Sequence, residues 1–331
     1  MDELRSACAA VADRAEHVSI DRDAIPRYAM SLSLEEPPPA PDPRAHLLSG
    51  TRAELAAFWL TLDAINFGSG WFPTLRKRAG RSGYFTIAIG VRERFAARGP
   101  WSAGELSQLD AGAVARVLRQ DPGHELMEGF ARSLRDLGRR VAQECEGRFE
   151  AVVETPGQPA VAAATGQPAV AASGDRGATA RAADTSAVAL ATRLGGWECF
   201  ADTSTYGRIS VPFLKRAQLA AADLARAGAA ELRDRHRLTM FADNLVPHVL
   251  RLDGVLRFED GLVRRIDRGE LIEHGSPEEI EIRACALHAV ELIVAHRPDS
   301  TAADVDQLLW HRGGQERYKS SRRHRSRCTA Y

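Results

Sequence analysis

Apolar residues recur at helical spacing along most of the chain. From residue 55 to residue 65, one helical face collects the apolar side chains of Leu55, Phe58, Trp59, Leu62 and Ile65. The same periodicity predicts helices in four further segments, residues 113–118, 126–145, 213–227 and 278–295. The best strand candidate is 84–91, where β-branched and aromatic residues cluster. The pattern therefore predicts a mainly α fold with a minor β element.

A capping signal marks the start of a last helix near the C-terminus. Ser300 or Thr301 can accept a hydrogen bond from the first turn, and Asp304 stands at capping-box spacing from Thr301. Apolar residues continue at helical spacing for about three turns beyond this point. We expect the helix to end near residue 311.

The segment 239–244, Thr-Met-Phe-Ala-Asp-Asn, places a carboxylate between an apolar shoulder and the start of another helix. Asn244 is predicted to cap that helix. Pro247 is expected in its first turn, where the amide proton that proline lacks has no intrahelical partner anyway. The helix dipole and the free amides favour an ionised carboxylate there. Asp243 is thus either a simple cap residue or a carboxylate poised to stabilise positive charge.

Composition and charge narrow the class of protein. The chain has 331 residues, enough for one large domain or two ordinary ones, and 44% of them are hydrophobic. Lys plus Arg and Asp plus Glu number 44 each, and this balance argues against a general nucleic-acid binder. The basic residues concentrate at 312–327. Such a tail is usually solvated or disordered, although it can also reach a phosphate.

Cysteine usage and the apolar runs indicate a reduced, cytoplasmic environment. The five cysteines are far apart and form no CxxC pair, so we expect neither a zinc site nor a disulfide framework. The first residues lack the apolar core of a signal peptide. No apolar run approaches the roughly 20 residues that span a bilayer, so no membrane contact is expected.

A short duplication interrupts the helical pattern. The unit Gly-Gln-Pro-Ala-Val-Ala-Ala occurs twice, starting at Gly157 and Gly166. The surrounding stretch, about 157–183, is rich in Ala, Gly and Pro. Such low-complexity composition predicts a surface loop insertion without a catalytic role.

Several further strings carry a resemblance to a known family. They are Val-Pro-Phe-Leu-Lys-Arg-Ala-Gln at 211–218, Leu-Asp-Ala-Ile-Asn-Phe at 62–67, Glu-Ile-Arg at 281–283 and Asp-Gln-Leu-Leu-Trp at 306–310. With the segment 239–244, they resemble the motif set of the queuosine salvage proteins, which are queuosine 5′-phosphate N-glycosylase/hydrolases. The resemblance covers about residues 18–331. It implies one helical domain over 1–331, similar in fold to the helix-hairpin-helix DNA glycosylases, with 157–183 as an insertion.

The resemblance also implies a reaction. The substrate would be queuosine 5′-monophosphate and the product queuine, with no metal or redox cofactor. Cleavage of the N-glycosidic bond passes through an oxocarbenium-like transition state, and Asp243 is expected to stabilise it, to orient a water or to attack the sugar. Queuine is a 7-deazaguanine and lacks a ring nitrogen that purine glycosidases often protonate. Help for this leaving group must therefore come from main-chain amides, His46 or Gln307.

The base would be bound by several of these residues. The family carries a histidine at the place of His46, which is therefore assigned to the base, an exposed loop histidine being the alternative. Asp306 lies four residues before Trp310, so both occupy one helical face; Asp306 would bind the secondary amine while Trp310 stacks on the ring. Phe241 offers a flat apolar contact. The alternative is an exposed aspartate and core aromatic rings.

Two further apolar residues and one cation complete the expected site. Met240 and Phe67 are candidate walls for the base, although for Met240 an ordinary core position is the commoner outcome. Lys215 near a helix start would bind the 5′-phosphate, or else pair with a carboxylate such as Asp243. Arg216 is expected to point to solvent or to the basic tail.

Two other functions stay open. One is a DNA or RNA base glycosylase, for which residues 252–256 offer a loose likeness to the hairpin turn of the DNA glycosylases. The balanced charge argues for a free nucleotide over a nucleic acid as partner. The other is a protein that binds queuosine or queuine without cleaving it.

Overall fold

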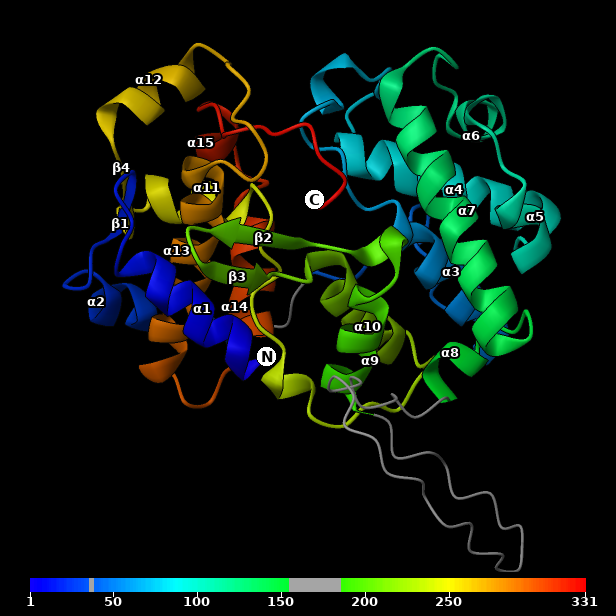
Figure 1. Ribbon diagram of the computed structural model, residues 1–331, viewed down its shortest axis with the longest axis horizontal. Coiled ribbons are helices and arrows are strands. Elements are labelled where there is room, and N and C mark those ends of the chain that lie inside the picture. Colours follow the sequence, from blue (N-terminus) through cyan, green and yellow to red (C-terminus); the bar gives the residue numbers. More distant parts are fainter. Residues whose placement is uncertain (36–38, 155–185) are drawn as a thin grey trace, which may run out of the picture.

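The computed structural model describes residues 1–35, 39–154 and 186–331. The predicted insertion at 157–183 lies outside the described residues. Helices dominate the structure, as the periodicity predicts, and they gather around two separate hydrophobic clusters (Figure 1). We call the two parts the terminal lobe, with core residues from 4–32, 211–213 and 240–318, and the middle lobe, with core residues from 45–200 and 217–238.

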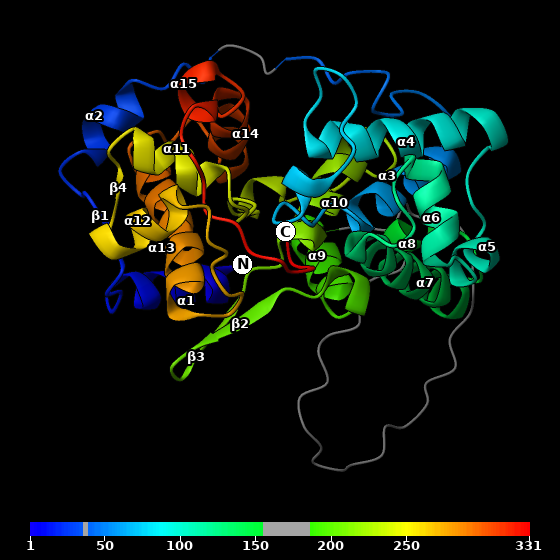
Figure 2. The ribbon, with the colours of Figure 1, turned by 90° about the horizontal axis from the view of Figure 1, so that it is seen from above.

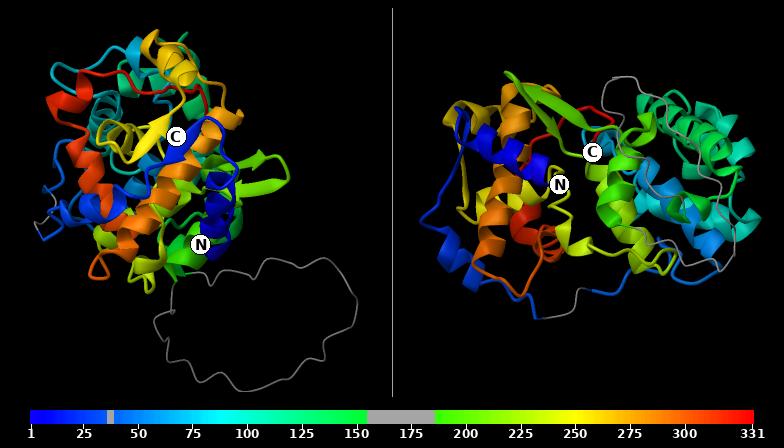
Figure 3. Two further views of the ribbon diagram at one scale, coloured as in Figure 1. Left: turned by 90° about the vertical axis from the view of Figure 1, so that its left-hand side faces the viewer. Right: turned by 60° about the horizontal axis from the view of Figure 1, so that its bottom comes forward.

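The terminal lobe combines the two ends of the chain. Its elements are α1 (Asp2–Ala12), β1 (Val18–Ile20), α2 (Ile25–Met30), α11 (Val246–Leu252), β4 (Leu256–Phe258), α12 (Asp260–Asp267), α13 (Pro277–Ala295), α14 (Ala302–Arg312) and α15 (Glu316–Lys319). Helix α13 is apolar around most of its circumference and therefore runs through the lobe core, with α1 packed along it (Figure 3). Strands β1 and β4 pair antiparallel and join the N-terminal segment to the C-terminal helices.

The middle lobe is a helical assembly built on α3. Its elements are α3 (Arg52–Ala64), α4 (Gly83–Arg98), α5 (Ala103–Ser107), α6 (Ala111–Leu118), α7 (Glu125–Cys145), α8 (Ala151–Glu154), α9 (Ala187–Gly195), α10 (Lys215–Arg226) and the 3-10 turns η1 (Phe72–Thr74), η2 (Glu198–Phe200) and η3 (Arg235–Arg237). Helix α3 is buried from Leu55 to Ala64, and a capping box between Thr51 and Glu54 fixes its start. The five predicted helices and the last one, capped by Thr301, are confirmed.

The predicted strand at 84–91 is wrong, because these residues lie in α4. Ser82 caps the helix by accepting a hydrogen bond from the Phe85 amide. Ile87, Val91 and Phe95 stand at i, i+4 and i+8 and are buried in the middle lobe. Burial of that helical face overrides the β propensity of the individual residues.

A hairpin and the C-terminal tail connect the lobes. Strands β2 (Thr203–Tyr206) and β3 (Ile209–Pro212) pair antiparallel and run between the lobes (Figures 1 and 2). The residues after α15 continue back to the junction, where the Gly68 amide donates a 2.9 Å hydrogen bond to the Tyr331 carbonyl. Tyr331 is only 2% exposed. The tail is therefore ordered and anchored at the junction, whereas some of its basic side chains, such as Arg322 and Arg327, are exposed as expected.

Candidate active site

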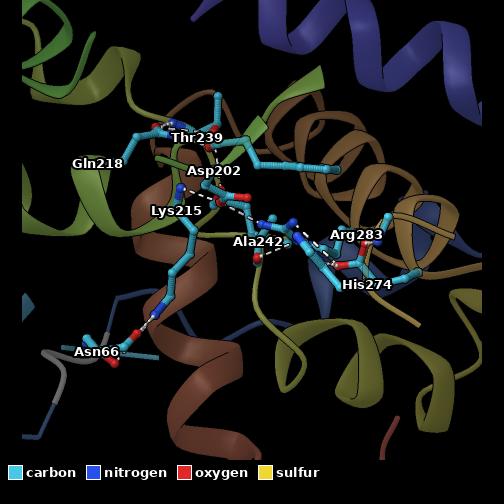
Figure 4. A network of polar contacts seen from close by, with 12 residues as sticks. Asn66, Asp202, Lys215, Gln218, Thr239, Ala242, His274 and Arg283 are labelled. Atoms are coloured by element: carbon cyan, nitrogen blue, oxygen red, sulfur yellow. Dashed lines mark hydrogen bonds and ion pairs between the residues drawn. The ribbon is translucent and has the colours of Figure 1, made fainter. Parts of the chain in front are cut away.

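The segment 239–244 is a loop that enters the junction of the lobes and leads into α11. Three of its backbone groups are bound by buried side chains of α10, α13 and α14, and Figure 4 shows Gln218 beside Thr239 and Arg283 beside Ala242. The bonds are Thr239 N to Gln218 Oε1 at 2.9 Å, Phe241 N to Asp306 Oδ1 at 3.0 Å and Arg283 Nε to Ala242 O at 3.0 Å. Because three helices hold consecutive parts of this loop, the side chain that follows, Asp243, has a fixed place.

Asp243 accepts two hydrogen bonds at the start of α11, whose N-cap position is Leu245. Its Oδ1 accepts hydrogen bonds from the amides of Leu245 at 2.8 Å and Val246 at 3.1 Å. The predicted cap, Asn244, is wrong: its Nδ2 donates at 3.1 Å to the His324 carbonyl in the tail. Asp243 is partly exposed, and its Oδ2 has no hydrogen-bond partner among the described residues. One oxygen thus anchors the carboxylate while the other is available to a ligand.

Three charged groups surround Asp243. Burial raises the pKa of Asp306 well above its ordinary value, and the charge of Asp243 raises it further. Burial lowers the pKa of Lys215 and of Arg323, whereas Asp243 raises the pKa of both cations. Asp306 therefore favours its neutral form beside the carboxylate of Asp243.

Lys215 is the first residue of α10 and is 7% exposed. Its ammonium donates to the Asn66 carbonyl at 3.0 Å and lies 3.5 Å from Asn66 Oδ1 (Figure 4). It forms no ion pair with Asp243 within the described part of the chain, although the charges of Asp243, Asp63 and Asp202 all raise its pKa. Lys215 therefore sits in a carboxylate-rich part of the junction and faces the sequence motif of α3.

Two buried carboxyl groups flank Lys215. Asp63 of α3 is fully buried, and neither of its carboxyl oxygens has a hydrogen-bond partner within the described residues. Burial raises the pKa of Asp63, and the charge of Asp223 raises it further. Burial also raises the pKa of Asp223 to about 6, against the opposing charges of Arg226 and Lys215. The sequence offered one signal for Asp63, a carboxylate inside an otherwise apolar helical run.

His46 lies in a group of aromatic rings drawn from both lobes. Its Nε2 is 2.9 Å from the Tyr84 hydroxyl, and its ring stacks on Trp59 with centroids 5.3 Å apart. Trp310 of α14 approaches the rings of Tyr84 at 6.0 Å and Phe85 at 6.4 Å. The alternative of an exposed loop histidine is wrong, because His46 is 8% exposed and burial lowers its pKa. Tyr84 and Phe85 escaped the sequence reasoning, which placed them in a strand.

The other residues predicted to contact the base divide into two kinds. Phe241 is 7% exposed yet belongs to neither hydrophobic cluster, and Gln307 is partly exposed without a hydrogen bond to any described residue. Both are placed to meet a ligand. Met240 is fully buried in the core of the terminal lobe, and Phe67 is 1% exposed in the core of the middle lobe. The structure therefore favours a packing role for Met240 and Phe67.

Arg216 does not point to solvent, so that expectation is wrong. It is 1% exposed, and its Nη1 donates to the Ala64 carbonyl at 2.6 Å and to the Cys199 carbonyl. Its guanidinium also lies 5.0 Å from the centre of the Phe67 ring. The residues of the Lys-Arg-Ala-Gln string thus have different roles. Lys215 faces the site, Arg216 stabilises the middle lobe by binding two of its backbone carbonyls, and Gln218 binds the segment 239–244.

The described residues hold neither a metal-binding cluster nor a membrane-spanning helix. No group of three or more His, Cys, Asp or Glu side chains in the described ranges is arranged to hold a metal ion. In the same part of the chain, no helix combines the length and the apolar character needed to cross a membrane.

Comparisons with known proteins all indicate the same protein family. A family model described as queuosine salvage protein matches residues 173–331. Over 336 residues the chain is 32% identical to the queuosine 5′-phosphate N-glycosylase/hydrolase of Sphaerobacter thermophilus, an alignment that covers 97% of this chain and 95% of that protein. The protein of the same name from Mus musculus is 29% identical over 149 residues, an alignment that covers 40% of this chain and 44% of that protein. The one from Schizosaccharomyces pombe is 36% identical over 117 residues, which cover 34% of each chain. The chain therefore belongs to the queuosine salvage protein family.

Proposed function

We propose that this protein hydrolyses queuosine 5′-monophosphate to queuine and ribose 5-phosphate. The observation that carries the proposal is the place of Asp243, whose Oδ1 is bound by two amides at the start of α11 while Oδ2 has no partner among the described residues. A relative aligned over 97% of this chain and another aligned over 40% of it are both named queuosine 5′-phosphate N-glycosylase/hydrolase.

Asp243 acts on the sugar in this mechanism. As the glycosidic bond breaks, its electron pair moves to the ring nitrogen of the base and positive charge develops on the ribose. A fixed carboxylate beneath C1′ stabilises that charge without reorganising during the reaction. Water then supplies the new C1′–O bond, either directly or after Asp243 has held the ribose covalently.

The base lies between the lobes in this proposal. Phe241 and Trp310 provide flat apolar surfaces, and His46 and Gln307 provide polar contacts at the edge of the ring. Asp306 faces the secondary amine of queuine. The cationic amine stabilises the ionised form of Asp306, so the buried carboxyl and the amine compensate each other's loss of water.

Lys215 serves the ribose 5-phosphate end of the site. Its ammonium lies in the field of Asp243, Asp63 and Asp202. A cation in this place offsets the repulsion that these carboxylates exert on an anionic substrate.

The first test is chromatography of purified protein incubated with queuosine 5′-monophosphate, beside the Asp243→Asn variant. Asn keeps an oxygen that can cap α11, so the variant should fold while losing the negative charge. We expect the wild type to release queuine and the variant to be about 100- to 1,000-fold slower, the usual cost of removing one preorganised electrostatic group. Intact nucleotide in both samples despite measurable binding would leave the protein as a queuosine-binding protein.

The base-glycosylase alternative has less support. Residues 252–256, which resemble a DNA-glycosylase hairpin, connect α11 to the strand β4 and do not join two helices directly. A base glycosylase would bind duplex DNA or RNA with an affinity that falls steeply with salt. Titration of a labelled duplex at two salt concentrations tests this alternative.

A further inference from the structure

Arg323, in the tail after α15, is an unpaired cation beside the candidate active site. Its side chain has no hydrogen-bond or ion-pair partner in the residues that the structure describes, although it is only partly exposed. The neighbouring tail arginines are engaged elsewhere: Arg325 donates to the Gly269 carbonyl at 2.8 Å, and Arg327 pairs with Glu125 at 3.2 Å. An enclosed guanidinium without a counter-ion costs free energy, so its partner is expected to be a ligand.

The tail backbone around Arg323 is fixed on both sides. The Arg322 carbonyl accepts from Arg251 at 3.1 Å, and the His324 carbonyl accepts from Asn244 at 3.1 Å. Asn244 directly follows Asp243, so this bond ties the tail to the catalytic loop. Arg323 is therefore held near Asp243 by its two chain neighbours, and a guanidinium fixed in this way loses little entropy when it binds.

The positive charge of Arg323 calls for an anionic ligand, and its place near Asp243 puts that anion on the sugar side of the site. Asp243 raises the pKa of Arg323, which places the two groups within electrostatic reach. In the proposed reaction Asp243 faces C1′, and the 5′-phosphate hangs from the same ribose ring. A guanidinium presents a planar fork of donors that matches two phosphate oxygens.

Lys215 alone is a poor receptor for that phosphate. Its ammonium already donates to Asn66, and three carboxylates lie in its surroundings. A phosphate placed there would meet their negative charge. Arg226, another cation near the site, is already paired with Asp223.

We propose that Arg323 binds the 5′-phosphate of the substrate and makes the enzyme prefer the nucleotide to the nucleoside. This inference rests on the proposed function. It assigns the tail a direct part in substrate recognition, because the residue that reads the phosphate comes from the last nine residues of the chain.

The test compares hydrolysis of queuosine 5′-monophosphate with hydrolysis of the nucleoside queuosine by the wild type and by Arg323→Ala. We expect kcat/KM for the nucleotide to fall about 100-fold in the variant, typical for loss of a charged hydrogen-bonding partner. The nucleoside lacks the phosphate, so Arg323→Ala should turn it over at the wild-type rate. That unchanged turnover also shows that the variant is folded. Arg322→Ala is the matched control, because Arg322 is exposed and its guanidinium lies against Gly269. It should behave as wild type with both substrates.

A second measurement is independent of catalysis. Calorimetry with ribose 5-phosphate should detect binding to the wild type and to Arg322→Ala, and none to Arg323→Ala. Equal losses for nucleotide and nucleoside, or no loss for either, would overturn the phosphate role. If the wild type cleaves neither substrate, the proposed function fails and the calorimetry alone decides whether Arg323 binds phosphate. Should Arg323→Ala fail to fold, Arg323→Lys keeps the charge but not the fork, and only its nucleotide KM should rise.

Discussion

Asp306 and Asp243 lie close together, and the residues around them give the two carboxyl groups different tasks. Asp243 accepts two hydrogen bonds from backbone amides, and its other carboxylate oxygen has no partner among the described residues. Asp306 is buried and accepts one hydrogen bond, from the Phe241 amide. Burial and the charge of Asp243 raise the pKa of Asp306, so the empty site holds a proton there. Carboxyl groups whose surroundings separate their pKa values commonly divide the work of a site in this way.

This difference predicts a proton linkage when the base binds. The cationic amine of queuine should ionise Asp306, so binding should release a proton from this carboxyl group. Calorimetry of queuine binding in two buffers of different ionisation enthalpy measures the release directly. Asp306→Asn cannot ionise, and its binding enthalpy should not depend on the buffer. The same buffer dependence in wild type and variant would mean that another group releases the proton.

Asp223 should make stability depend on pH. Its pKa in the folded protein is about 6, above the ordinary value of 3.8, so the folded state holds the proton more tightly than the unfolded chain does. The stabilisation is present in full below pH 3.8 and is lost as the pH rises through 6. Urea unfolding of wild type and Asp223→Asn from pH 4 to 7.5 should show the wild type losing about 1–3 kcal/mol relative to the variant. Parallel curves would show that Asp223 titrates as it does in the unfolded chain.

At the scale of elements, α10 orders the segment 239–244. Gln218 donates to the Phe213 carbonyl and to Thr239 Oγ1, each at 3.0 Å, and accepts from the Thr239 amide at 2.9 Å. These contacts join the end of β3 to the start of the segment 239–244 through one buried side chain. A change at Gln218 should therefore move Asp243 without touching substrate.

Gln218→Ala tests this arrangement. Loss of the buried contacts should reduce the free energy of unfolding by about 2–3 kcal/mol, because the Thr239 amide and the Phe213 carbonyl lose their partner. We expect kcat to fall more than KM rises, since the misplaced group acts in the transition state. Gln108→Ala is the control, because Gln108 is exposed at the end of α5 and should change neither quantity. Unchanged kcat in a destabilised Gln218→Ala would confine Gln218 to stability.

Periodicity was sufficient for the long helices but not for the site. Segments such as α7 and α13 have apolar patterns that a helix alone explains, and a capping box marks the start of α14. In residues 84–91, β-branched and aromatic residues cluster in a way that suits a strand, and only packing within the middle lobe selects the helix. Tyr84 and Arg323 could not be predicted as site residues because their proximity to His46 and Asp243 depends on how segments far apart in the sequence pack together.

At the scale of the whole molecule, the tail holds the two lobes together. Tyr331 packs under the guanidinium of Arg283 at 4.6 Å from the ring centre, and its carbonyl binds the Gly68 amide of the middle lobe. The Ile272 amide of the terminal lobe donates to the Arg325 carbonyl at 2.9 Å. The tail thus contacts both lobes while carrying Arg323 past Asp243, so its seating should govern both stability and turnover.

Gly70→Ala should unseat this tail. A Cβ at Gly70 would overlap the Ser326 carbonyl, a backbone atom that cannot turn aside, so the tail must shift. We expect the free energy of unfolding to fall by about 1–3 kcal/mol, as for other overpacked positions. Trypsin should release short peptides ending at Tyr331 much faster than from wild type, which mass spectrometry detects.

Gly104→Ala is the matched control for this substitution. Gly104 lies in α5, where the nearest atom to an added Cβ is 4.0 Å away, so alanine fits and favours the helix. This variant should release the C-terminal peptides at the wild-type rate. If Gly70→Ala also releases them at that rate while its nucleotide turnover falls, the tail stays seated and the loss arises at the Gly68–Gly70 turn. If peptide release and nucleotide turnover of Gly70→Ala both stay at wild-type values, the junction tolerates a shifted tail. Arg323 then reaches its ligand without the tail being seated as in the wild type.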